Sequence, residues 1–220
     1  MPVKICKECG NEVWCDCYSE NCNICGPYKP YYNVRLHQAF EAASLVHKGQ
    51  ERKNPVGVPF VSHCFAVYDL VHQYTNDEDT LIAALLHDAI EDNEEIGMQV
   101  VLSFGDDVLE YVQYVTEPPK YDDDGNKIKW RQRKSMYAKK LKYAPLGAKM
   151  ISAADKIHNI NSLLIAHRAG VNVWKMMTTN AEDQISRYQE LVEALSNNWS
   201  WSHPLLKQLK SDLDFLSQLV

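Results

Sequence analysis

From Asn33 to the C-terminus, apolar residues recur every three or four positions, which is the spacing of an amphipathic α-helix. Asn33 is suited to cap the first helix, in which Leu36, Phe40, Ala43 and Val46 follow at helical spacing. This stretch shows no period-two pattern typical of strands, no internal repeat and no glycine-rich phosphate loop. The sequence therefore predicts an all-α fold for this part of the chain.

The same pattern places further helices. A second helix is expected from about Ser62 to Tyr74, and a third, with Asp77 or Asp79 as its cap, carries the apolar run 81–86. Amphipathic segments follow near 106–116, 130–143, 147–166, 181–196 and 203–219. One long polar loop, from Thr116 to about Lys129, interrupts this order, and loops of that length in compact domains are often functional.

Composition and charge narrow the function classes. Hydrophobic residues make up 45% and charged residues 24% of the sequence, the balance of a folded soluble protein. A net charge of -6 argues against a general binder of nucleic acid or membrane surfaces. No run approaches the roughly 20 apolar residues of a spanning helix, and the start carries charges and cysteines where a signal peptide would be apolar. We therefore expect a cytoplasmic protein.

The N-terminus is a separate, cysteine-rich segment, predicted to cover residues 1–30 and to precede a helical domain at 31–220. Two Cys-x-x-Cys-Gly knuckles predict one closed, structural zinc site with the ligands Cys6, Cys9, Cys22 and Cys25. Cys15 and Cys17 could be free thiols, could replace one knuckle pair as ligands, or could bind a second metal. An iron–sulfur cluster or redox disulfides are further alternatives for the cysteines of this segment. The segment could stabilise the N-terminus, cover the active site, or contact a protein partner or a second copy of the chain.

The stretch from Leu85 to Asp92 carries the most chemistry. It is expected as an apolar helix that ends by presenting His87 and Asp88, with Glu91 and Asp92 one turn later on the same faces. Imidazole and carboxylate together suit manganese, iron or zinc, and such an ion lowers the pKa of bound water. Glu91 is then placed to act as a general base or to orient that water. Alternatively, this is a solvated helix end.

Two distant segments strengthen the metal interpretation. Asp155 follows small apolar residues on a strongly helical stretch, and Asn159 shares its face one turn later. His63 stands at the start of the second predicted helix, after a proline-containing loop. Each is common alone, but their combination favours a metal site.

These motifs in this order resemble the hydrolase domain of the RelA/SpoT family, most closely the stand-alone small alarmone hydrolases similar to the metazoan SpoT homologue. The resemblance covers roughly residues 33–200 and rests on the segments 42–53, 59–63, 87–92 and 154–159. It implies an all-helical HD-type phosphohydrolase that binds one manganese ion and removes pyrophosphate from the 3′ position of (p)ppGpp, leaving GDP or GTP. The synthetase and regulatory segments of long members are not in this chain, so hydrolysis without synthesis is implied.

The resemblance also implies roles for single residues. One metal ion would be held by His63, His87, Asp88 and Asp155. Water activation falls to Glu91 and Asp92, and the nucleotide would be bound by Arg52, Lys53 and Asn159. Phe60 departs from the family, which usually has tyrosine there, and Ala89-Ile90 replaces a common Thr-Val.

A substrate with two diphosphate groups requires a local positive field, which this acidic protein must supply from clusters. Lys48, Arg52 and Lys53 form one cluster. The second, between Lys127 and Lys142, contains no acidic residue, and its expected phosphate contacts are Arg131, Arg133 and Lys134. An amphipathic surface helix would carry similar charge, and Trp130 could either stack on a base or simply pack.

Two other functions stay open. The same site could serve another nucleotide, such as the 2′-phosphate of NADPH or pppApp, since Phe60 and the 117–129 loop are unusual. The chain could also be a non-catalytic nucleotide sensor whose zinc-binding segment contacts a partner. The complete acidic set, including Glu91, argues against a degenerate sensor.

Overall fold

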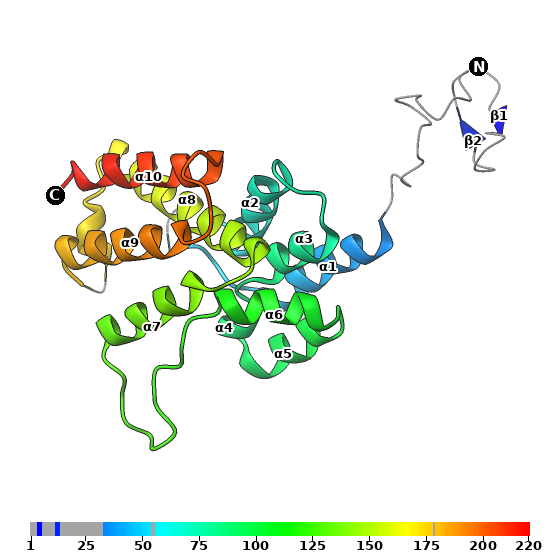
Figure 1. Cartoon of the computed structure of the whole chain (residues 1–220), viewed down its shortest axis with the longest axis horizontal. Helices are drawn as coiled ribbons and strands as arrows, with labels where there is room; N and C mark the ends of the chain where they lie inside the picture. The colour runs from blue at the N-terminus through cyan, green and yellow to red at the C-terminus, as the bar shows by residue number, and fades with distance from the viewer. Residues whose placement is uncertain (1–3, 6–11, 14–32, 54–55, 178) are drawn as a thin grey trace. The chain divides into compact units, whose positions relative to one another are not determined.

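The computed structural model describes residues 4–5, 12–13, 33–53, 56–177 and 179–220, and it divides the chain into two compact units, Met1–His37 and Gln38–Val220 (Figure 1). In the first unit, β1 (Lys4–Ile5) and β2 (Glu12–Val13) pair antiparallel, with Lys4 opposite Val13. This ladder was not expected, because two residues are too few to show a period-two pattern. The predicted zinc ligands lie outside the described residues, and the division after residue 30 stays a prediction.

The described residues from 33 onward are mostly helical, which confirms the predicted class. Helices lie at α1 (Val34–Val46), α2 (Val61–His72), α3 (Glu78–Leu86), α4 (Ala89–Asp92), α5 (Glu94–Leu102), α6 (Asp106–Val115), α7 (Trp130–Lys142), α8 (Leu146–Arg168), the 3-10 helix η1 (Val173–Met176), α9 (Ala181–Ser196) and α10 (Pro204–Ser217). None of the helices in the described part of the chain combines the length and the apolar character that a bilayer span requires.

Side-chain caps fix where several helices begin. The Asn33 side chain accepts a hydrogen bond from the backbone N of Leu36 at 3.0 Å, as the sequence predicts. Asp77, rather than Asp79, caps α3, because its carboxylate accepts from the backbone N of Thr80 at 2.9 Å. These bonds satisfy backbone donors that have no partner inside the helix.

Helix α8 is the centre of the second unit. Every residue from Gly147 to Ile157 is buried, so this part of the helix is enclosed on all sides, and α8 packs against α2, α3, α6 and α10 (Figure 1). The polar members of this buried stretch include Asp155 and Lys156. Charged groups in such a position need partners, which directs attention to their surroundings.

The structure corrects the expected geometry after α3. His87 and Asp88 do not continue the apolar helix: they form a turn between α3 and α4, in which the backbone of Asp88 lies at φ -96 and ψ -2, at the edge of the right-handed helical region. Glu91 and Asp92 therefore lie on the separate, short helix α4. Helix α5 was also missed from the sequence, although Asn93 ends α4 and caps α5 by accepting from the backbone N of Ile96.

A glycine sets the distance between α4 and α5, and its replacement gives a stability prediction. A Cβ atom added at Gly97 would lie 2.1 Å from the backbone O of Ala89. Because backbone cannot move aside as a flexible side chain can, we expect Gly97→Ala to lower the free energy of unfolding by about 1–3 kcal/mol. Denaturant unfolding measures this, with the exposed Gln99→Ala on α5 as control. Equal stability of both variants would contradict this packing.

Candidate metal centre and active site

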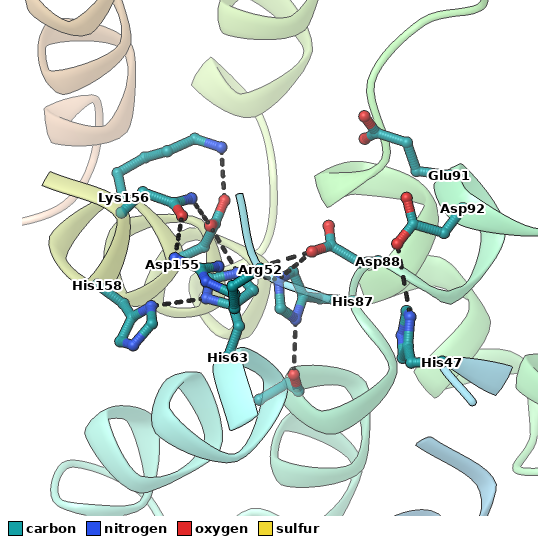
Figure 2. A network of polar contacts seen from close by, with 12 residues as sticks. His47, Arg52, His63, His87, Asp88, Glu91, Asp92, Asp155, Lys156 and His158 are labelled. Carbon is teal, nitrogen blue, oxygen red and sulfur yellow. Dashed lines mark hydrogen bonds and ion pairs between the residues drawn. The ribbon is translucent and has the colours of Figure 1, made fainter. Parts of the chain in front are cut away.

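Two histidines from different helices face each other in the core. His63 lies in the first turn of α2 and His87 follows α3, and their exposed fractions are 1% and 2%. Their Nε2 atoms are 3.2 Å apart, while Nδ1 of His87 lies 2.9 Å from the backbone O of Ala84 (Figure 2). A carbonyl only accepts, so Nδ1 of His87 donates and its Nε2 is directed toward His63.

Two carboxylates converge on the same nitrogen atoms. Nε2 of His63 lies 3.2 Å from an Asp155 oxygen, and Nε2 of His87 lies 3.1 Å from an Asp88 oxygen. Donor atoms of His63, His87 and Asp155 all lie within 4.8 Å of one another, and Asp88 is also 3.6 Å from His63. This mixed imidazole and carboxylate set fits a divalent cation.

A second layer of contacts holds these donors in place. Asp155 accepts hydrogen bonds from Lys156 and from Asn159, and Nδ1 of His63 is 2.8 Å from Nδ1 of His158 (Figure 2). Burial alone would raise the pKa of the Asp155 carboxyl, but the Lys156 ammonium and His63 hold it well below its usual value. Asp155 is therefore a carboxylate, the form that binds a cation, and its outer contacts fix its orientation.

Asp92 has its own positioning partner. The buried ring of His47, at the end of α1, places Nδ1 3.5 Å from an Asp92 oxygen and 2.8 Å from the side-chain oxygen of Gln50 (Figure 2). No role was predicted for His47 from the sequence. This contact holds Asp92 beside the cluster, and Asp92 is not one of the grouped donors His63, His87 and Asp155.

These groups open on a cavity of about 680 Å³. The predicted functional residues in its wall are Arg52, Lys53, His63, Asp88, Glu91, Asp92, Lys134, Asp155 and Asn159. Lys48, Arg131 and Arg133 do not line it, and His87 lies behind the wall. The structure thus brings most of the predicted residues from five separate segments to one place.

The first basic cluster is divided by the structure. The Arg52 guanidinium lies 3.4 Å from the side-chain oxygen of Asn159 and 3.2 Å from Ser162 Oγ, and it sits over the Phe60 ring at 5.9 Å. Arg52 is therefore held in the cavity between α8 and the aromatic ring. Lys48 is exposed outside it, so its predicted substrate contact has no geometric support.

The second basic cluster is divided in the same way. Lys134 lines the cavity, while Arg133 pairs with Glu117 at 3.2 Å. Arg131 instead pairs with Asp183 on α9 at 3.0 Å, on the exposed surface, and is not a substrate contact in this geometry. The sequence could not show this division, because both acidic partners lie far from the cluster along the chain.

Glu91 stands at the edge of the cavity near the cluster. Burial and the nearby Glu117 and Asp88 carboxylates raise the pKa of its carboxyl to about 7. The backbone N of Glu117 donates to its carboxylate at 3.3 Å. A carboxylate with a pKa near neutrality is suited to take a proton from water.

This pKa predicts a pH dependence. A general base acts in its ionised form, which is populated above its pKa, so kcat/KM should rise with pH through about 7 and then level off. Steady-state rates over a pH series measure this. In Glu91→Gln, the residual activity should no longer rise with pH through about 7. A profile that is flat across neutral pH in the unaltered chain would contradict the assignment of Glu91.

Several cavity residues were missed from the sequence. Lys156 lay within a recognised motif without a role, whereas Glu117, Gln184, Arg187 and Tyr188 belong to segments with no motif. The amphipathic pattern of 181–196 predicted α9 but not which of its polar residues would face a cavity. Only the fold supplies that information.

Comparison with known proteins assigns the fold to a family. A family model described as HD domain matches residues 39–180, a range that includes all four predicted metal ligands. The chain belongs to the HD-domain family. The HD domain ends, by this match, before α9, so the contribution of Arg187 and Tyr188 to the cavity comes from beyond the matched residues.

The HD-domain chain is similar to proteins of known name. It is 30% identical over 132 residues to the human guanosine-3′,5′-bis(diphosphate) 3′-pyrophosphohydrolase MESH1, covering 59% of this chain and 70% of that protein. The Drosophila melanogaster MESH1 is 31% identical over 137 residues, covering 61% and 73%. A solved structure described as a metazoan ortholog of SpoT that hydrolyzes ppGpp has a TM-score of 0.65 and 25% identity, covering 87% of this chain and 98% of that one.

Proposed function

We propose that this HD domain is a metal-dependent 3′-pyrophosphohydrolase of (p)ppGpp, which releases pyrophosphate and leaves GDP or GTP. One observation carries the proposal: the donor cluster of His63, His87 and Asp155 shares a cavity with cations from α7, α8 and α9. Such a cavity suits a substrate with two diphosphate groups, because it offers an ion site and cationic side chains that can contact phosphate groups. The names of the two similar MESH1 proteins support this substrate class.

The proposed ion is one manganese held by His63, His87, Asp88 and Asp155. A divalent cation there would polarise a phosphoryl oxygen and lower the pKa of a water molecule. Asp155, with Lys156 and Asn159 fixed on its oxygens, keeps the carboxylate form that such an ion needs. Ligand chemistry alone also admits iron or zinc, so manganese is the preference of the proposal.

In this proposal, side chains of the cavity accept the proton of the attacking water and bind the substrate. Glu91 takes the proton of the attacking water, and Asp92, fixed by His47, orients that water. The water oxygen bonds to the phosphorus attached to the 3′ oxygen, and the bond from that phosphorus to O3′ breaks, which releases pyrophosphate. O3′ takes a proton from solvent water and ends as a hydroxyl, while Glu91 returns its proton to the solvent. Arg52, Lys53, Lys134 and Asn159 bind the nucleotide, since all four line the cavity.

Further parts of the proposal concern the whole chain. We assign a structural zinc ion to Cys6, Cys9, Cys22 and Cys25, on the basis of their two knuckle spacings. We also propose a cytoplasmic location, the domain limits 1–30 and 31–220, and contact with a protein partner or a second copy through the N-terminal segment.

The zinc assignment predicts a specific loss. Cys9→Ser removes one thiolate of a four-thiolate site, so the full chain should lose its zinc when dialysed against a weak chelator. Cys17→Ser is the matched control and should keep it. Elemental analysis of both proteins measures this, and equal zinc content in the two would contradict the chosen ligand set.

Another nucleotide is the second candidate, and one observation favours keeping it. Phe60 lines the cavity beside Arg52 and offers a bare ring where a tyrosine would present a hydroxyl. Specificity toward ribose or base could therefore differ from that of the named relatives, with NADPH or pppApp as substrates. A non-catalytic sensor with a zinc-binding partner module is a third candidate, for which the cavity provides no separate support.

A substrate panel tests the proposal. The full chain is stripped of metal, reloaded with manganese and incubated in parallel with ppGpp, NADPH and pppApp, and phosphate and pyrophosphate are measured separately. The proposal expects pyrophosphate from ppGpp at the highest rate. Phosphate from NADPH with no reaction of ppGpp would overturn the substrate assignment and retain the site. Binding without turnover of any of the three would support a sensor.

A further inference from the structure

Glu117 places a carboxylate inside the wall of the proposed active site. It follows α6, at the start of the 117–129 segment, and its side chain is 11% exposed. One of its oxygens accepts from Lys134, and the other lies 3.2 Å from the guanidinium of Arg133. Glu117 and Lys134 line the cavity together with Glu91, Lys156 and Arg187, whereas Arg133 contacts Glu117 without lining the cavity itself.

The contacts of Glu117 are those that a phosphate group would make. Its two oxygens accept charge-assisted hydrogen bonds from an ammonium and a guanidinium, the usual donors for phosphate. Burial alone would raise the pKa of this carboxyl, but Lys134, Lys156 and Arg187 together hold it below its usual value. The carboxylate is therefore charged and sits where several positive groups converge.

One of those groups still has an unused donor. The Nε atom of Arg187 is buried and has no hydrogen-bond partner among the described residues, while its guanidinium stacks on the Tyr188 ring at 4.1 Å. Arg187 is thus oriented without having all its donors satisfied. A phosphate group, with more acceptor oxygens than a carboxylate, could use donors that Glu117 leaves free.

The Glu117 side chain can rotate without breaking the hydrogen bond between its backbone N and Glu91, although its carboxylate charge is one cause of the raised pKa of Glu91. Its contact with Glu91 is made by the backbone N, at 3.3 Å, and not by the carboxylate. Lys140 fixes the same stretch of backbone by donating to the backbone O of Gln113 at 2.7 Å and of Thr116 at 2.6 Å. Rotation of the Glu117 side chain therefore leaves the backbone contact in place.

We infer that Glu117 is a specificity-determining residue: its carboxylate occupies the anion seat formed by Lys134 and Arg133, and a ligand binds fully only by delivering a phosphate group that displaces it. The inference rests on the proposed function for the identity of the substrate. The site would then select ligands that carry at least two anionic groups. A ligand with a single anionic group cannot occupy the donor cluster and the anion seat at the same time.

The anion seat can be tested by binding, without catalysis. Inorganic pyrophosphate is titrated calorimetrically into the full chain in the presence of EDTA, so that no metal contributes. Glu117→Gln keeps the shape and removes the competing charge, and it should bind pyrophosphate at least about fivefold more tightly. The control Glu110→Gln makes the same charge change at an exposed position of α6 and should bind as the unaltered chain does.

Lysine variants test whether the tighter pyrophosphate binding of Glu117→Gln depends on Lys134. Lys134→Gln should weaken pyrophosphate binding at least about fivefold, because it removes a charged donor, whereas the exposed Lys139→Gln on the same helix should not. In the double variant Glu117→Gln/Lys134→Gln, the gain from Glu117→Gln should vanish. Equal or weaker binding by Glu117→Gln, an equal gain in Glu110→Gln, or unchanged binding by Lys134→Gln would each overturn the inference.

Kinetics with ppGpp and manganese supply the second readout. At a pH well above the pKa of Glu91, where the base is ionised with or without the Glu117 charge, Glu117→Gln should lower KM for ppGpp and narrow the preference for ppGpp over less charged nucleotides. A fall in kcat with unchanged KM would instead mark Glu117 as structural. If the unaltered chain releases no pyrophosphate, the proposed function fails, while the titrations with inorganic pyrophosphate still decide the role of Glu117.

Discussion

His87→Ala is expected to lower kcat for hydrolysis of ppGpp by at least about a thousandfold, because losing an ion ligand removes several kcal/mol of charge stabilisation. Nε2 of His87 lies 3.2 Å from Nε2 of His63 and 3.1 Å from Asp88, so the side chain stands inside the donor cluster. The affinity for manganese should fall in parallel. Pyrophosphate release and equilibrium metal titration on the same preparation measure both effects.

The matched control is His167→Ala, which removes an exposed histidine near the end of α8. It should leave both rate and metal affinity unchanged. Circular dichroism confirms that each variant is folded, which matters because His87 is buried. Retention of full activity and full manganese affinity in folded His87→Ala would show that the metal centre lies elsewhere.

Glu91→Gln is expected to lower kcat by roughly a hundredfold to ten-thousandfold, the range that a positioned general base contributes. The amide cannot take the proton of water, although it keeps the shape of the side chain and can contact the backbone N of Glu117. Because Glu91 does not belong to the donor cluster, manganese affinity should stay the same. This separation of rate from metal binding distinguishes Glu91 from the ligands.

Glu94→Gln, an exposed change at the start of α5, is the control for Glu91→Gln and should retain the full rate. A loss of manganese affinity in Glu91→Gln as large as in His87→Ala would make Glu91 a ligand instead of a base. A rate close to that of the unaltered chain would move the base to Asp92, the other acidic residue on α4.

The helical pattern predicted most of the fold because burial repeats with the period of the helix. Helix α9 was expected at 181–196 and lies at Ala181–Ser196, and α7 differs from its expected range by a single residue at one end. The break at Asp88 and the short helix α4 could not be predicted, since nothing in the run from Leu85 to Asp92 interrupts a helical pattern. Asn93 offered a cap signal that was overlooked.

Site residues could be predicted from the sequence where they belong to a recognisable motif. Contacts between side chains from segments far apart in the sequence could not be predicted, because only the fold brings those segments together. His63, the His87-Asp88 pair and Asp155 come from recognisable motifs, and the structure brings them together. The structure separates Arg131 from Arg133 and Lys134, all three predicted phosphate contacts, because Asp183 and Glu117 approach that helix from other segments. Charge along a helix does not reveal which side faces a cavity.

Pyrophosphate release from ppGpp by the manganese-loaded full chain, compared with its Asp88→Asn variant, tests the central claim most directly. The account predicts pyrophosphate and GDP in equal amounts from the unaltered chain, with the rate abolished in the variant, whose amide replaces a carboxylate beside both histidines. An unaltered chain that releases no pyrophosphate from ppGpp, or a variant that releases it at the same rate, would contradict the account.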